Sequence, residues 1–152
     1  MTTSPQARNR VSLANPLPRI GIGVDVHSFA SDDRTLSLAG LTWPGERGLA
    51  GHSDSDVAAH AACDALFSAA GLGDLGSQFG IDRPELADAS GLTLMKQAGR
   101  PVADTGFGIG TIATQILCNH PNAGHRRPAD QDAWPRGRVP PVDVASTPRT
   151  SP

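Results

Sequence analysis

Alternating apolar residues in the first part of the chain predict two β-strands. In RIGIGVDVHSF (19–29), every second side chain is apolar: Ile20, Ile22, Val24 and Val26. This period of two gives a strand with one apolar face and one close-packed face lined with glycine. A weaker alternation in TLSLAGLTW (35–43), which ends at Pro44, predicts a second strand.

An apolar repeat of four residues predicts a long helix from Ser53 to Ala70. Its apolar positions are Val57, Ala58, Ala61, Ala62, Ala65, Leu66, Ala69 and Ala70. Ser53 with Asp56 resembles a capping box, and the glycines of GLGDLG (71–76) end the helix. This is the clearest helix in the chain.

The remaining patterns are less regular. A second helix is predicted around Ser90–Gln97, limited by Gly99 and Pro101. ATQILC (113–118) predicts a strand, and PVDVAST (141–147) predicts another in a segment that is otherwise rich in proline and aperiodic. These elements indicate one mixed α+β domain.

Composition narrows the function classes. The chain has 152 residues, of which 38% are hydrophobic and 18% charged, as is ordinary for a soluble domain. A net charge of -2, a pI near 6.2 and only 4% aromatic residues argue against a nucleic-acid partner bound through phosphate contacts and base stacking. Residues 1–17 lack the apolar stretch of a signal peptide and are expected to form a disordered leader in a cytoplasmic protein.

The two cysteines, Cys63 and Cys118, form no CxxC pair. One disulfide between them is open as an alternative, but two buried free thiols in a reducing cytosol fit better.

Histidine and aspartate residues provide the candidate chemistry. Asp25 and His27 are two residues apart on the first strand and therefore face the same side, and His60 lies inside the long helix. One carboxylate and two imidazoles would form a three-ligand zinc site with an open fourth position. The alternative is that His60 is a structural residue and that the DxH pattern occurs by chance.

Three neighbouring residues have weaker interpretations. Asp56, His60 and Asp64 share a stripe of the long helix at i, i+4 and i+8. Asp56 is either part of this stripe or a helix-cap partner, and Asp64 would orient a histidine without binding the ion. His52, beside Ser53 at the helix N-terminus, lies where an anion such as a phosphate would bind, or simply in a polar loop.

Three motifs resemble the signature blocks of the 2-C-methyl-D-erythritol 2,4-cyclodiphosphate synthase family. They are GVDVHSF (23–29), GHSDSDVAAHAACDAL (51–66) and GLGDLGSQF (71–79), in the family's order and spacing. The resemblance covers 18–82 strongly and 86–119 moderately. It implies a ferredoxin-like α/β layer, a homotrimer with active sites between subunits, and three segments: leader 1–17, family domain 18–127 and a divergent part 128–152.

The resemblance also implies roles for individual residues. Asp25, His27 and His60 would bind zinc, and His52 with Ser53 would stabilise charge on the reacting phosphates. The substrate's methylerythritol hydroxyls would be held by Asp74, Leu75 and Gly76, with Phe79 closing that pocket and Thr147 contacting phosphate. The implied reaction converts 4-diphosphocytidyl-2-C-methyl-D-erythritol 2-phosphate to the 2,4-cyclodiphosphate with release of CMP, assisted by a second cation, Mg²⁺ or Mn²⁺.

The chain departs from the family pattern near its C-terminus. Asn122 stands where lysine is usual, Pro148 replaces a phosphate-stabilising threonine, and Thr150 replaces the acid that binds the second cation. Residues from about 128 onward are therefore expected to derive from a frameshifted or degraded gene. The alternative function is a catalytically impaired, metal-binding remnant of the enzyme. A generic zinc hydrolase is a weaker interpretation, because no HExxH or comparable motif is present.

Overall fold

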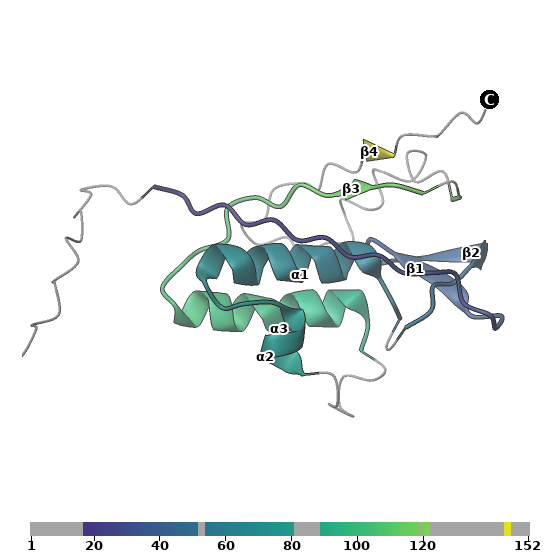
Figure 1. The fold of residues 1–152 in the computed structure, drawn as a ribbon, viewed down its shortest axis with the longest axis horizontal. Helices are drawn as coiled ribbons and strands as arrows, with labels where there is room; N and C mark the ends of the chain where they lie inside the picture. Colours follow the sequence, from purple (N-terminus) through teal and green to yellow (C-terminus); the bar gives the residue numbers. More distant parts are fainter. Residues whose placement is uncertain (1–16, 52–53, 81–88, 119, 122–144, 147–152) are drawn as a thin grey trace, which may run out of the picture.

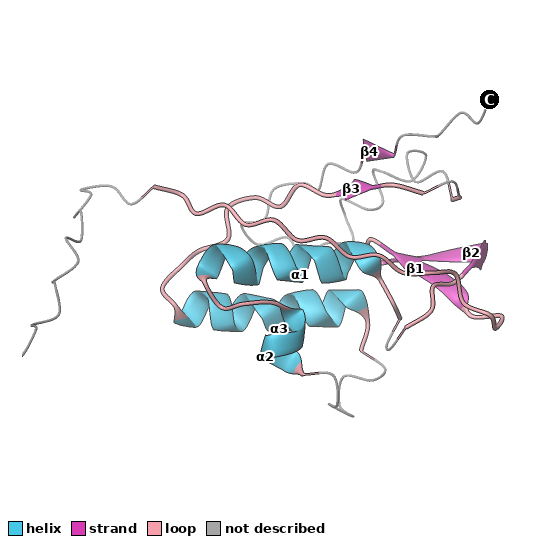
Figure 2. Cartoon of the chain, viewed as in Figure 1, coloured by secondary structure: helices cyan, strands magenta, loops and turns pink. Residues whose placement is uncertain are grey.

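The computed structural model describes residues 17–51, 54–80, 89–118, 120–121 and 145–146. Its elements, in chain order, are β1 (Thr35–Leu38), β2 (Leu41–Arg47), α1 (Val57–Ala70), α2 (Leu75–Phe79), α3 (Gly91–Asp104), β3 (Gln115–Ile116) and β4 (Ala145–Ser146). Figure 1 shows α1 and α3 side by side, with the extended segment 17–28 running along α1. The mixture of helices and strands in Figure 2 confirms the α+β prediction.

Segment 19–29 is extended, as predicted, but within the described part of the chain it pairs as a strand only through a bridge between Phe29 and Leu49. Its alternation is preserved: Gly21, Gly23 and the side chains of Asp25 and His27 face α1, and the apolar side chains face outward. These apolar side chains are largely exposed: Ile20 (89%), Ile22 (80%), Val24 (75%) and Val26 (85%). The prediction of a close-packed glycine face is therefore confirmed.

The predicted single strand over 35–43 is wrong, because the chain turns within it. β1 and β2 form an antiparallel hairpin in which Leu38 pairs with Leu41. Ala39 and Gly40 between them both have positive φ, at 54° and 75°. Two successive positive φ angles give the tight turn that suits the twist of a hairpin. Pro44 lies inside β2 rather than ending a strand.

α1 begins at Val57, later than predicted, because the side chain of Asp56 caps it by accepting from the amides of Ala58 and Ala59. Asp56 is thus the N-cap itself and not the second member of a box started by Ser53, which lies outside the described residues. Gly71, in the left-handed conformation with φ 76°, ends the helix as predicted.

α3 is longer than the predicted Ser90–Gln97. It starts after the N-cap Ser90 and passes through both Gly99 and Pro101 to Asp104. Its buried face, which includes Leu94, Ala98 and Val102, continues on both sides of the proline. Packing of that face against α1 outweighs the hydrogen bond that the proline removes. α2 was not predicted from the sequence, and of the predicted strand 113–118 only β3 is formed, parallel to β4.

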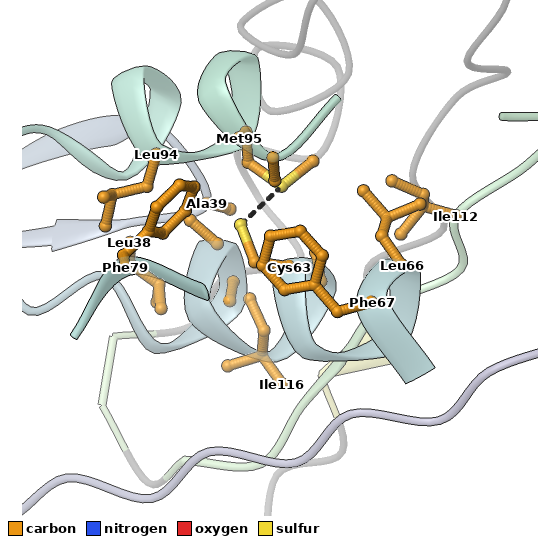
Figure 3. Close-up of a cluster of buried hydrophobic side chains, with 14 of the residues drawn as sticks. Leu38, Ala39, Cys63, Leu66, Phe67, Phe79, Leu94, Met95, Ile112 and Ile116 are labelled. Atoms are coloured by element: carbon orange, nitrogen blue, oxygen red, sulfur yellow. Dashed lines mark hydrogen bonds between the residues drawn. The ribbon is translucent and has the colours of Figure 1, made fainter. Parts of the chain in front are cut away.

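The hydrophobic core lies between α1, α3 and the β1–β2 hairpin. Figure 3 shows Cys63 of α1 against Met95 of α3, with their sulfur atoms 3.6 Å apart. Phe67 is fully buried and meets Phe79 of α2 edge-on, with ring centroids 5.7 Å apart. Both cysteines are free, but Cys118 is only half-buried. Burial raises the pKa of the Cys63 thiol to about 12.

Candidate metal centre

Two glycines allow the extended segment to lie directly on the backbone of α1. A Cβ on Gly21 would lie 2.0 Å from the carbonyl oxygen of Ala65, and one on Gly23 the same distance from that of Ala61. The segment therefore runs antiparallel to α1, and two residues forward along the segment correspond to four residues backward along α1. The two steps have similar lengths, about 6.6 Å in an extended chain and about 6 Å in a helix.

The same register brings the predicted ligands together. The next inward-facing residue after Gly23 is Asp25, and its Oδ2 lies 3.0 Å from Nδ1 of His60. Nδ1 of His27 lies 3.2 Å from the same oxygen. Candidate ligand atoms of all three residues lie within 4.8 Å of one another. The predicted convergence of a strand and a helix is therefore present.

The chemistry of the triad fits a divalent cation. The three side chains are mostly shielded, with 21% of Asp25, 18% of His27 and 13% of His60 exposed. Although Nδ1 of His27 lies 3.2 Å from Oδ2 of Asp25, this buried atom makes no hydrogen bond within the described part of the chain. A shielded imidazole nitrogen without a hydrogen-bond partner in these ranges, beside a carboxylate and a second imidazole, belongs to a set of groups suited to a cation such as zinc.

Gly51 supports the ring of His27 from behind. A Cβ at Gly51 would lie 2.9 Å from Nε2 and Cδ2 of that ring. The carbonyl of Gly51 accepts from Arg34 Nη1 at 3.1 Å, and Arg34 is itself paired with Asp32 at 2.8 Å. The Arg34 hydrogen bond lowers the pKa of Asp32 to about 2. This chain of contacts fixes the backbone immediately before His52.

Asp56 is a structural centre rather than a ligand. Its Oδ1 accepts from the amides of Ala39, Ala58 and Ala59, and its Oδ2 from that of Gly40 at 2.6 Å. Burial raises the pKa of the Asp56 carboxyl, while these amide hydrogen bonds oppose the shift. The helix-cap interpretation of Asp56 is confirmed, and the residue also ties the hairpin turn to α1.

Asp54 makes a similar connection that the sequence did not suggest. Its Oδ2 accepts from the amide of Gly91, the first residue of α3, at 2.8 Å, and its Oδ1 accepts from the amide of Asp56. A Cβ at Gly91 would meet Ala59 and Asp56 at under 3.0 Å. The dense run of small and acidic residues between His52 and Asp56 was the available signal. Asp54 thus joins the N-terminal ends of both long helices.

Among the described residues, Asp64 makes no hydrogen bond to a histidine. Its Oδ1 accepts from the amide of Leu75 at 2.7 Å and so links α1 to the start of α2. At α2, Asp74 is the N-cap in a capping box with Ser77. The hydrogen bond from the Ser77 amide lowers the pKa of Asp74.

The remaining predicted site residues are placed as follows. Leu75 and Gly76 form the first turn of α2, whereas Phe79 is buried against Phe67 in the core. The predicted contact of the Phe79 ring with a substrate stays a prediction. The predicted phosphate contacts and the second-cation position lie outside the described residues. The residues concerned are His52, Ser53, Asn122, Thr147, Pro148 and Thr150.

The α+β scaffold thus brings one aspartate and two histidines together at a possible site for a divalent cation. No helix in the described ranges is long and apolar enough to cross a membrane.

Comparison with known proteins identifies the family. The YgbB family matches residues 18–133. A 2-C-methyl-D-erythritol 2,4-cyclodiphosphate synthase of Acidothermus cellulolyticus is 60% identical over 111 residues, 73% of this chain and 68% of that protein. A protein of the same name from Cutibacterium acnes is 42% identical over 85% of this chain and 77% of its own. The chain belongs to the YgbB family, that of the 2-C-methyl-D-erythritol 2,4-cyclodiphosphate synthases.

Solved structures agree. A 2C-methyl-D-erythritol-2,4-cyclodiphosphate synthase described as a CDP-bound form matches 85% of this chain and 89% of its own, with a TM-score of 0.73 and 32% identity. The bifunctional IspDF of Campylobacter jejuni matches with the same TM-score and identity, but this chain spans only 36% of that longer protein.

Proposed function

We propose that this protein is a 2-C-methyl-D-erythritol 2,4-cyclodiphosphate synthase. Its substrate would be 4-diphosphocytidyl-2-C-methyl-D-erythritol 2-phosphate, and its products the cyclic diphosphate and CMP. The observation that carries the proposal is the meeting of Asp25, His27 and His60, within 4.8 Å, in a chain that is 60% identical to a protein of that name. Similarity to a relative of that name supports the family alone, and the meeting of the three side chains adds support for the site.

The reaction is an internal phosphoryl transfer. An oxygen of the 2-phosphate bonds to the β-phosphorus of the diphosphate, and the bond from that phosphorus to the oxygen of the CMP phosphate breaks. CMP leaves with that oxygen and its electron pair. No atom of the protein becomes covalently bound, so catalysis rests on positioning and on neutralising phosphate charge.

Asp25, His27 and His60 would hold the divalent cation, proposed to be zinc. A bound zinc ion would polarise a phosphate oxygen as a Lewis acid. The buried Nδ1 of His27, which lacks a hydrogen-bond partner within the described ranges, supports this assignment. His52 and Ser53 are proposed to stabilise phosphate charge at the turn before α1, and Thr147 to contact phosphate. The second cation, Mg²⁺ or Mn²⁺, is proposed from the family resemblance alone.

Asp74, Leu75 and Gly76 are proposed to bind the substrate's hydroxyl-bearing carbon chain. The capping box already uses Asp74 Oδ1, and Asp64 already accepts from the Leu75 amide. The second oxygen of the Asp74 carboxylate is the acceptor we propose for a substrate hydroxyl. Its exposed position supports this role.

We further propose that the protein assembles as a homotrimer. The support is the exposed apolar strip of segment 19–29, four side chains at least 75% exposed on one extended face. Contiguous apolar surface of this kind marks association sites. Val24→Asp should lower the mass of the assembly measured by light scattering, whereas Gln97→Asp on the exposed face of α3 should not.

A cytoplasmic location is proposed on the free thiols of Cys63 and Cys118, which fit a reducing compartment.

Release of CMP from the cytidyl substrate by the purified chain is the decisive test. Activity should be lost with chelator and restored by zinc. His60→Asn should abolish it, and the exposed His120→Asn should serve as the matched control. A chain that binds one ion per subunit but releases no CMP would contradict the proposal and favour the impaired remnant.

A further inference from the structure

Asp64 lies where three functional segments of the protein meet. It is one helical turn beyond His60 on α1, so the two side chains lie on the same side of that helix. Its carboxylate accepts a partly buried hydrogen bond from the amide of Leu75, at 2.7 Å. A Cβ on Gly23 would lie only 2.8 Å from the Asp64 Cβ, so the segment that carries Asp25 passes directly over it.

The other hydrogen bonds of the first turn of α2 are local, although the partly buried side chain of Leu75 also packs against the core. Asp74 and Ser77 bond to each other, and the Gln78 side chain donates to the carbonyl of Leu72. Among hydrogen bonds between described residues, that of Asp64 is the one that joins this turn to the metal-binding face of α1. Apolar packing anchors α2 through Phe79 at its far end and Leu75 at its beginning, while Asp64 supplies the directional contact at the beginning.

We propose that Asp64 is a positioning residue, which holds the turn Asp74–Gly76 at a fixed place relative to the Asp25–His27–His60 triad. This inference rests on the proposed function, in which the triad fixes a phosphate and the turn fixes hydroxyls of one small substrate. An internal transfer requires both ends of the substrate to be placed at once. A displacement of the triad or of the turn by about 1 Å lowers the fraction of bound substrate that can react.

The test compares Asp64→Ala with Asp64→Asn in the full chain. Asparagine keeps an oxygen that accepts from the Leu75 amide, whereas alanine removes it and leaves a good helix former on α1. We expect Asp64→Ala to lower kcat/KM for CMP release about 10- to 100-fold. Asp64→Asn should stay within about threefold, and zinc affinity, measured by titration calorimetry, within about twofold for both variants.

Amide hydrogen exchange provides a readout without substrate. Residues 75–78 should exchange faster in Asp64→Ala than in Asp64→Asn or the parent chain, while the α1 amides stay protected. A loss of stability alone, without a change in kcat/KM, would show a purely structural role and overturn the proposal.

Other results also decide between explanations. Equal losses in both variants would assign the effect to the charge rather than to the hydrogen bond, and a parallel loss of zinc affinity would assign Asp64 to the triad. Either outcome refutes the positioning role. If the parent chain releases no CMP, the proposed function falls, and the exchange data alone then show whether Asp64 holds the turn.

Discussion

A methyl group at Gly23 should disable the metal centre without touching a ligand. Its carbon would lie 2.0 Å from the carbonyl oxygen of Ala61 and 2.6 Å from the amide nitrogen of Ala65. Both atoms belong to the backbone of α1 and cannot rotate away. Ordinary contact begins at 3.4 Å, so segment 19–29 must move away from the helix by 3.4 minus 2.0, or 1.4 Å.

That displacement carries Asp25 and His27 away from His60, which stays on α1. Metal sites tolerate changes of only about 0.2 Å in their ligand distances. The strain itself should cost about 1–3 kcal/mol, as overpacking usually does. Gly23→Ala is therefore expected to lose most of its zinc affinity, by at least a factor of about 10, and to unfold at lower urea concentration than the parent.

Gly99→Ala is the matched control. It places the same methyl group inside α3, where a Cβ would meet no atom within 4 Å. Alanine is favoured over glycine in a helix interior by about 0.5–1 kcal/mol, so this variant should be slightly more stable and bind zinc normally. The measurements are calorimetric zinc titration and urea unfolding of both variants. Unchanged zinc affinity in Gly23→Ala would refute the reasoning that backbone contact sets the ligand register.

Three further predictions concern the caps and the metal. Asp56→Ala should cost roughly 3–7 kcal/mol in urea unfolding, since two turn amides lose a buried acceptor at about 1–3 kcal/mol each and α1 loses its cap at about 1; a cost below about 1 kcal/mol would contradict this. The lowered pKa of Asp74 means its ionised form stabilises the fold above the ordinary pKa of 3.8, and the gain is lost as pH falls through the folded value. Asp74→Asn, which keeps the cap but not the charge, should thus show a smaller fall in melting temperature between pH 5 and 2 than the parent, and identical slopes would count against the assignment. Zinc at 100 times its Kd should add about 2.7 kcal/mol of stability, so chelation should lower the melting temperature of the parent but leave that of His60→Asn unchanged.

Local patterns were enough to predict that Asp25, His27 and His60 lie together. The two-residue period of segment 19–29 placed Asp25 and His27 on one face, and the helical repeat placed His60 on α1. The close-packed glycine face was also predictable, because glycine at alternate positions leaves room for another backbone. What the sequence could not provide was the register of the segment against α1, which depends on the contacts of Gly21 and Gly23 with particular carbonyls.

The errors have physical causes of two kinds. The turn at Ala39–Gly40 lacks the Asn-Gly or Asp-Gly pair that marks tight hairpins, and its geometry is supported from a distance by Asp56. α3 passes Pro101 because burial of Val102 outweighs local preference. In both places a tertiary contact decides what a local rule leaves open.

The acidic residues show this most clearly, because one residue type has four roles within a short stretch of chain. Asp54 holds the start of α3, Asp56 the hairpin turn and the cap of α1, Asp64 the start of α2, and Asp25 a histidine pair. Each of the first three carboxylates accepts hydrogen bonds from backbone amides of another element, and such partners leave no mark in the sequence of the acid itself. Only Asp25 lies beside two imidazoles, so ligand chemistry separates it from the others. Among these four carboxylates, the group that faces each one, amide or imidazole, separates the three braces from the proposed ligand, and position in a motif does not.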